Sequence, residues 1–177
     1  MTNHIDRVLV GYAGTAGSTK SVAEFIAARL RARGLTTDLR DLAEKPSVDG
    51  YDALVLGSGV RDAALLPSAE NFMWHNADAL RTRPVWLFSV GISPSLRGPL
   101  GNLLREVVPT RIAELCELIE PRDYHAFAGV VPRTGAALPA RFLLWLCGGR
   151  YGDLRDWPGI EAWTTGIAEY LHGAVTA

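Results

Sequence analysis

Cysteine is scarce in this chain, which has only Cys116 and Cys147 among its 177 residues. The two lie far apart and form no C-x-x-C pair, so we expect free thiols in a reducing compartment. Long apolar runs are absent too, since none approaches the roughly 18 residues needed to cross a bilayer. The polar opening MTNHIDR has no secretory signal. These absences predict a cytoplasmic protein that contacts a membrane at most at its surface.

Excess charge is also lacking, because the formal net charge is −1. A nucleic-acid binder is usually strongly basic, so that class is excluded. The four histidines have no ligand spacing with cysteines or acids, and no G-x-S-x-G elbow occurs. We therefore predict no metal site and assign no catalytic residue. An enzyme with this sequence would rely on a bound cofactor for its chemistry.

What the sequence does contain is a regular alternation of apolar strand-like and amphipathic helix-like segments. Strands are expected at 8–12, 37–42, 51–60, 84–91 and 125–131, and helices at 22–33, 67–80, 98–120 (interrupted at Pro109) and 159–171. This order predicts a single α/β domain over residues 1–177, with a parallel sheet covered by helices on both faces. Ligands of such sheets bind at the carboxyl ends of the strands, here in the loops 13–19, 57–66 and 89–98.

The first of these loops lies in the stretch GYAGTAGSTKS, residues 11–21. A Walker A loop needs glycine directly before its lysine, but Thr19 precedes Lys20. Gly11, Gly14 and Gly17 are spaced three apart, which does not fit the dinucleotide fingerprint. Backbone N–H groups and hydroxyls at a helix N-terminus suit a terminal phosphate dianion instead. The alternative is that Ser18 or Thr19 only caps the helix.

The same stretch resembles the FMN phosphate loop of flavodoxins, with Tyr12 at the strand end, then Gly17 and Thr19. The resemblance implies a three-layer α/β/α sandwich whose five-stranded parallel sheet has the order 2-1-3-4-5, and FMN as the cofactor. Gly14 stands where that family carries Ser or Thr, so Thr15 is expected to replace the missing hydroxyl. The implied FMN-binding residues are Gly14, Thr15, Ala16, Gly17, Ser18, Thr19, Ser58, Gly59, Val60, Arg61, Ser89, Val90 and Gly91.

Arg61 is the charged residue of the second loop, GSGVRDAALL, which has no aromatic residue to stack on a flavin. An arginine at this position would favour a reduced, anionic flavin by Coulomb attraction. The alternative for Arg61 is a surface ion pair with Asp62 or with a helix acid.

Residues 132–157 form an insert that is too long for a plain connection in this architecture. Within it, RFLLWLCGGRYGDLRDW resembles the tail of the bacterial quinone-dependent protoporphyrinogen dehydrogenase family, a flavodoxin-fold FMN family. Its arginines and apolar segment at 136–147 suit a membrane surface or a flat, carboxylate-bearing ligand. The alternative is a short helix that packs on the core.

The leading hypothesis is an FMN-dependent oxidoreductase that passes electrons from an organic substrate, such as a porphyrinogen, to a quinone or another small-molecule acceptor. The rival is a flavodoxin that carries electrons between proteins, for which an acidic docking face would be expected. The third is a flavodoxin fold that has lost its cofactor and serves as a binding module. The sequence leaves the oligomeric state open.

Overall fold

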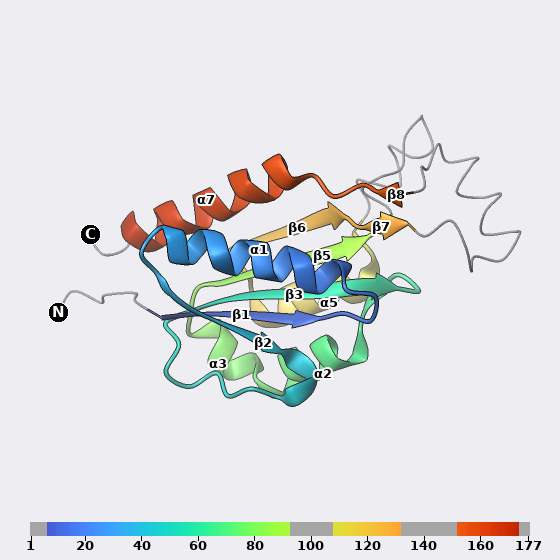
Figure 1. Cartoon of the computed structure of the whole chain (residues 1–177). Coiled ribbons are helices and arrows are strands. Elements are labelled where there is room, and N and C mark those ends of the chain that lie inside the picture. Colours follow the sequence, from blue (N-terminus) through green and yellow to red (C-terminus); the bar gives the residue numbers. More distant parts are fainter. Residues whose placement is uncertain (1–6, 93–107, 132–151, 174–177) are drawn as a thin grey trace, which may run out of the picture.

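The computed structural model describes residues 7–92, 108–131 and 152–173 of this chain (Figure 1). Its strands are β1 (Arg7–Ala13), β2 (Thr36–Asp41), β3 (Ala53–Arg61), β4 (Ala64–Leu65), β5 (Val85–Gly91), β6 (Asp123–Ala128), β7 (Val130–Val131) and β8 (Gly152–Asp153). Its helices are α1 (Ser18–Ala32), the 3-10 helix η1 (Leu42–Glu44), α2 (Pro67–His75), α3 (Ala77–Arg81), α5 (Thr110–Ile119) and α7 (Trp157–Gly173).

The main sheet has the strand order β2-β1-β3-β5-β6, and neighbouring strands along this path are parallel. Counted among the parallel strands alone, this is the order 2-1-3-4-5 that the sequence predicted. The five parallel strands point to the same side in Figure 1, so the loops that follow β1, β3 and β5 meet at one edge of the sheet. The predicted α/β fold with a parallel sheet is confirmed.

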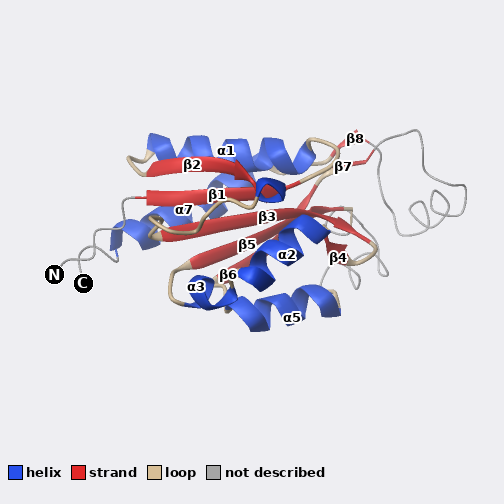
Figure 2. Cartoon of the chain, turned by 90° about the horizontal axis from the view of Figure 1, so that it is seen from below, coloured by secondary structure: helices blue, strands red, loops and turns tan. Residues whose placement is uncertain are grey.

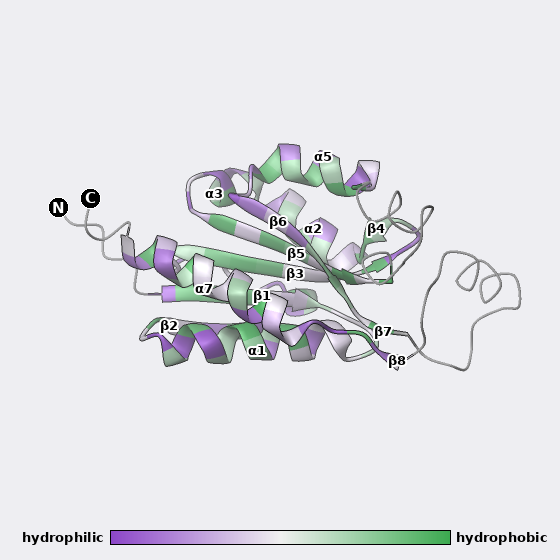
Figure 3. Ribbon diagram, turned by 90° about the horizontal axis from the view of Figure 1, so that it is seen from above, coloured by the Kyte–Doolittle hydropathy of each residue, from purple (hydrophilic) through white to green (hydrophobic). Residues whose placement is uncertain are grey.

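Helices cover both faces of the sheet, with α1 and α7 on one face and α2, α3 and α5 on the other (Figure 2). Successive residues of a strand point to opposite faces, and β1 shows the consequence. Val8 and Val10 pack with α1 and α7, whereas Leu9 between them packs with α2 and α5. The hydropathy colouring of Figure 3 shows the central strands as predominantly apolar, as expected for a sheet buried on both faces.

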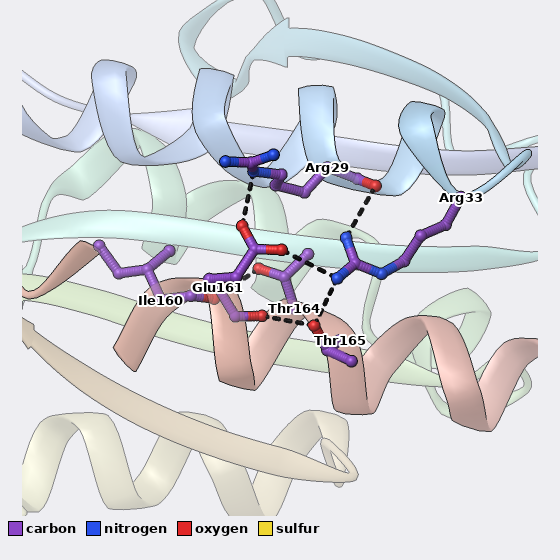
Figure 4. Close-up of polar contacts among 6 residues, drawn as sticks. All are labelled: Arg29, Arg33, Ile160, Glu161, Thr164 and Thr165. Atoms are coloured by element: carbon purple, nitrogen blue, oxygen red, sulfur yellow. Dashed lines mark hydrogen bonds and ion pairs between the residues drawn. The ribbon is translucent and has the colours of Figure 1, made fainter. Parts of the chain in front are cut away.

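A polar network joins α1 to α7, the two helices on one face of the sheet (Figure 4). The Glu161 carboxylate pairs with the guanidinium groups of Arg29 and Arg33, the latter at 2.8 Å. Arg33 also donates to the Thr165 hydroxyl at 2.6 Å and to the Arg29 carbonyl oxygen at 3.3 Å. The network joins the C-terminal end of α1 to the first half of α7 on the same face of the sheet.

Three local predictions need correction. The strand expected at 125–131 is divided at Gly129, because β6 ends at Ala128 and β7 pairs with β8 in a separate sheet. The predicted helix over 67–80 is two helices, because the chain breaks at Asn76, whose side chain donates to the Phe72 carbonyl oxygen at 2.8 Å. The residues after the third strand do not form an open loop. They form a hairpin in which Val60 and Arg61 of β3 pair with Leu65 and Ala64 of β4.

Three further predictions fall wholly or partly outside the described residues. These are the helix at 98–107, the end of the third loop at 93–98, and the insert segment 136–147. Among the described residues, no helix is long and apolar enough to cross a membrane.

Candidate cofactor site

The candidate site is built on four strand ends that stand side by side. In the register of the sheet, Ala13 lies beside Ser58, Ser58 beside Ser89, and Ser89 beside Ala126. The three predicted loops therefore start from the same level of the sheet. The three loops are far apart in the sequence, and it is the parallel pairing of their strands that aligns them.

The first loop connects β1 to α1 and provides unpaired donors. Gly17 is the N-cap of α1, in the left-handed region with φ 82° and ψ −20°, and no side chain caps the helix. The first helical N–H group with a backbone acceptor is that of Ser21, which donates to the Gly17 carbonyl oxygen at 3.0 Å. Among the described residues, the N–H groups of Ser18 and Thr19 have no such acceptor. No acidic residue lies in the first turn, so this helix end suits an anion.

The capping alternative for the first loop is not what the structure shows. The N-cap residue of α1 is Gly17, and neither the Ser18 nor the Thr19 side chain forms a capping hydrogen bond with the first turn. Thr15, Ala16 and Gly17 are exposed at the rim of the site, and Ser18 is half-buried. The loop is thus accessible from outside the protein, as a phosphate cradle requires.

Thr19 lies between the first and second loops and is only 3% exposed. A Cβ added to Gly14 would lie 2.9 Å from the Thr19 Cβ, and one added to Gly59 would lie 3.3 Å from the Thr19 Oγ1. Both glycines therefore leave room for Thr19. This packing places the Thr19 hydroxyl at the junction of the two loops.

In the second loop, Ser58 and Arg61 have different surroundings. Ser58 is fully buried, and its hydroxyl accepts from the Leu66 N–H at 2.9 Å and donates to the Gly59 carbonyl oxygen at 2.8 Å. This hydroxyl therefore holds the hairpin inside the protein, and the backbone of Ser58 lies between β1 and β5 in the centre of the sheet. Arg61 is exposed and forms no ion pair with another described residue, contrary to the surface-pair alternative.

The hairpin turn itself is unusual, because Asp62 and Ala63 both have positive φ, at 51° and 57°. Two left-handed residues in a two-residue hairpin loop define a type I′ turn. That turn strongly favours glycine at its second position, and alanine there is strained. The strained turn directly follows Arg61, which pairs with Ala64 across it.

The third loop begins with Ser89, Val90 and Gly91. The Ser89 hydroxyl shares a 2.7 Å hydrogen bond with the Tyr124 hydroxyl, and burial raises the pKa of Tyr124 above its ordinary value. Val90 is buried in the core. A Cβ added to Gly91 would lie 3.3 Å from the Val60 Cβ, so the second and third loops touch at this point.

The structure brings three further residues to this edge, Gly129, Ser21 and Arg155, of which the sequence indicated only Arg155, as one of the arginines of the insert. A Cβ added to Gly129 would lie 3.0 Å from Val90 Cγ1 and 3.8 Å from the Ser18 Oγ, so Gly129 joins the first and third loops. A glycine inside the expected strand 125–131 was an available signal, because glycine in a strand marks a bulge or a close approach. Arg155 donates to the Ser21 hydroxyl across 134 residues of chain, a contact that no local pattern could indicate.

A hollow of about 650 Å³ lies elsewhere, between η1 and α2, and its lining includes Leu42, Lys45, Phe72 and His75. None of the predicted FMN-binding residues lines it, so it is not the site described above. Within the described ranges, no three His, Cys, Asp or Glu side chains are grouped as a metal site would need.

The residues at the carboxyl edge fit a flavin mononucleotide. The loop at 14–19 provides free N–H groups and a helix end without acidic residues, and the glycines keep the cradle open. The family model for a flavodoxin domain matches residues 9–146. The chain belongs to the flavodoxin family. Its cofactor is FMN, which decides against the alternative of a cofactor-free binding module.

Comparison with curated proteins finds protoporphyrinogen IX dehydrogenase [quinone] of Escherichia coli strain K12, which is 25% identical over 101 residues. The match covers 54% of this flavodoxin-family chain and 56% of the relative, so the aligned part spans about half the length of that protein. The suspected relationship to this flavodoxin-fold enzyme family is therefore supported.

Solved structures give the same fold. An archaeal flavodoxin superposes with a TM-score of 0.57 at 15% identity, covering 94% of this chain and 99% of its own. Rubredoxin oxygen:oxidoreductase from Desulfovibrio gigas superposes with a TM-score of 0.61 at 14% identity, covering 97% of this chain and 37% of its own. At these identities the likeness shows the fold alone, and it is the flavodoxin-like three-layer α/β/α sandwich.

Proposed function

We propose that this FMN-dependent redox protein is an enzyme that passes electrons from a carboxylate-bearing organic substrate, such as a porphyrinogen, through FMN to a quinone. The observation that carries the proposal is the charge of the site. Arg61 is the single charged side chain among the thirteen predicted FMN-binding residues, and it is exposed and without an ion pair to a described residue. An exposed, unpaired guanidinium suits a carboxylate of a small organic molecule.

The protein's own residues have positioning roles in this proposal. The backbone of 14–19 would bind the phosphate, and the hairpin that carries Arg61 would border the ring together with Val90 and Gly91. The hydroxyls of Ser58 and Ser89 are buried and hydrogen-bonded inside the protein, so we assign them structural roles. The flavin supplies the electron-transfer chemistry when it is bound.

The similarity to the Escherichia coli enzyme supports a porphyrinogen as the donor and a quinone as the acceptor. The near-zero net charge supports a small-molecule acceptor over a steered protein partner. Peripheral contact at the inner face of the cell membrane through 136–147 is part of the same proposal, and that segment lies outside the described residues.

The test is anaerobic photoreduction of the bound FMN, followed by mixing with a water-soluble menaquinone analogue or with an oxidised redox protein. The proposal predicts rapid reoxidation by the quinone and slow reoxidation by the protein. The reverse result would identify an electron carrier between proteins and overturn the proposal.

The substrate part of the proposal is tested by Arg61→Gln. We expect a higher KM for a carboxylate-bearing donor with little change in quinone reoxidation, because Arg61 binds the donor's charge. Arg40→Gln, at a strand away from this loop, is the matched control. Equal KM values for the Arg61 variant and the wild type would exclude this role.

A further inference from the structure

Arg155 makes an organised set of contacts at the phosphate end of the site. Its guanidinium donates to both carboxylate oxygens of Asp153, with Nε to Oδ1 at 2.8 Å, and its Nη1 donates to the Ser21 hydroxyl. The guanidinium carbon also lies 4.7 Å from the centre of the Trp157 ring. The side chain is only 17% exposed, so it is held from three sides and is not a freely solvated surface arginine.

Ser21 passes this constraint to the first turn of α1. Its hydroxyl donates to the carbonyl oxygens of Gly17 and Ser18, at 3.1 and 2.9 Å. Arginine can only donate, so the Ser21 oxygen accepts from Arg155 with a lone pair. The single proton of the hydroxyl is then directed at these two carbonyls. The contact with Arg155 therefore fixes the direction of the Ser21 hydroxyl.

The two carbonyls belong to the peptide groups whose N–H groups face the predicted phosphate. In a trans peptide the N–H points opposite to the C=O. The carbonyl of Gly17 shares its peptide with the N–H of Ser18, and the carbonyl of Ser18 shares its peptide with the N–H of Thr19. When Ser21 holds the carbonyls on the helix side, both N–H groups point out of the helix end, toward the loop at 14–17.

We infer that Arg155 is a positioning residue for flavin phosphate binding, which acts through Ser21 on the N–H groups of Ser18 and Thr19. The inference rests on the placement of the FMN phosphate in the loop at 14–19, which belongs to the proposed function. Arg155 does not touch the phosphate in this account. Its effect is to make the loop select a phosphorylated flavin over riboflavin, which lacks the phosphate.

The neighbourhood of Arg155 supports this role. Leu154 donates its N–H to the Gly129 carbonyl oxygen at 3.2 Å, and Gly129 also borders Ser18 and Val90. On the other side of Arg155, the Trp157 ring packs on Phe25 of α1 with ring centres 5.0 Å apart. The segment 152–157 is thus joined to the phosphate loop on one side and to the phosphate-binding helix on the other.

The experiment measures the affinities of FMN and riboflavin for the full chain by quenching of flavin fluorescence. We expect Arg155→Gln to weaken FMN roughly three- to tenfold, as for the loss of one hydrogen bond, and to leave riboflavin unchanged. Ser21→Ala should produce the same selective loss. The double variant should lose no more than either single variant, because the two residues act in series.

Arg122→Gln is the matched control. Arg122 also stacks on an aromatic ring, that of Tyr170 at 4.3 Å, but it precedes β6 at the opposite edge of the sheet. This variant should leave the ratio of FMN to riboflavin affinity unchanged. Should Arg155→Gln fail to fold, Ser21→Ala gives the same readout with a smaller change.

Two results would overturn the inference. One is an Arg155→Gln protein with the wild-type ratio of FMN to riboflavin affinity, and the other is an equal loss for both flavins, which indicates general destabilisation. If the wild type itself binds FMN no more tightly than riboflavin, the phosphate placement within the proposed function fails instead.

Discussion

The Thr19 side chain fills the space beside Gly14, since a Cβ on Gly14 would lie 2.9 Å from the Thr19 Cβ. The flavodoxin motif carries Ser or Thr where this chain has Gly14, so Gly14→Ser would restore the motif. We expect the opposite of a gain: a loss of about 1–3 kcal/mol in the free energy of unfolding, from overpacking against Thr19. FMN affinity should fall as well, because the loop backbone must move.

Urea denaturation and FMN titration of Gly14→Ser measure both effects. The control is Gly166→Ala in α7, where an added Cβ meets nothing within 4 Å. That variant should gain about 0.5–1 kcal/mol from helix propensity. A Gly14→Ser protein with wild-type stability would mean that the loop is not packed as described.

Ala63 adopts a left-handed conformation, with φ 57°, in the turn between β3 and β4. Ala63→Gly should stabilise the protein by roughly 1 kcal/mol, because glycine adopts positive φ without a steric cost. Ala28→Gly, at an exposed position inside α1, should destabilise it by a similar amount. Thermal unfolding of both variants checks the two signs, and a destabilised Ala63→Gly protein would contradict the turn geometry.

Glu161 connects α7 to two arginines of α1. We expect Glu161→Ala to cost about 1–2 kcal/mol of unfolding free energy, since Arg29 and Arg33 both lose a charged partner. Glu24→Ala removes an exposed pair with Lys20 at 3.9 Å and should cost at most about 0.5 kcal/mol. Equal losses in urea denaturation would show that the network adds no stability beyond an exposed ion pair.

Asp153 makes the free energy of unfolding depend on pH in the acidic range. Hydrogen bonds from Arg155 lower the pKa of the Asp153 carboxyl from 3.8 to about 2. A carboxyl whose pKa is lower in the folded state stabilises the fold above its unfolded pKa, and that stability is lost as pH falls. The stability difference between wild type and Asp153→Asn should therefore be constant above about pH 5 and shrink between about pH 4 and pH 2.

Urea denaturation at pH 6 and pH 3 measures that difference. Arg155 is the charged group that faces Asp153 among the described residues, so no other described partner offsets the effect. A difference that is the same at both pH values would show that the pair does not form.

The sheet could be predicted from sequence because its signals are local. Buried strands such as 84–91 are continuous apolar runs, and alternation with amphipathic helices implies parallel pairing and hence a common carboxyl edge. Gly14 and Gly17 marked the first loop because a phosphate cradle requires small residues near a helix start. These features depend on neighbours in sequence.

The parts that could not be predicted depend on distant or weak signals. The hairpin was missed because β4 has only two residues and its turn is Asp62–Ala63, not the Asn-Gly pair typical of a type I′ turn. The internal use of the Ser58 hydroxyl depends on Leu66, eight residues away. The link from Arg155 to Ser21 joins opposite ends of the chain and exists only after folding.

The placement of the FMN phosphate at the start of α1 is tested most directly by titrating wild type and Thr19→Ala with FMN and with riboflavin. We predict that Thr19→Ala weakens FMN by about 1–3 kcal/mol, the cost of losing a hydrogen bond to a charged group, while riboflavin affinity stays unchanged. Thr82→Ala, an exposed threonine after α3, should change neither affinity. An unchanged FMN affinity in Thr19→Ala would contradict this placement of the phosphate.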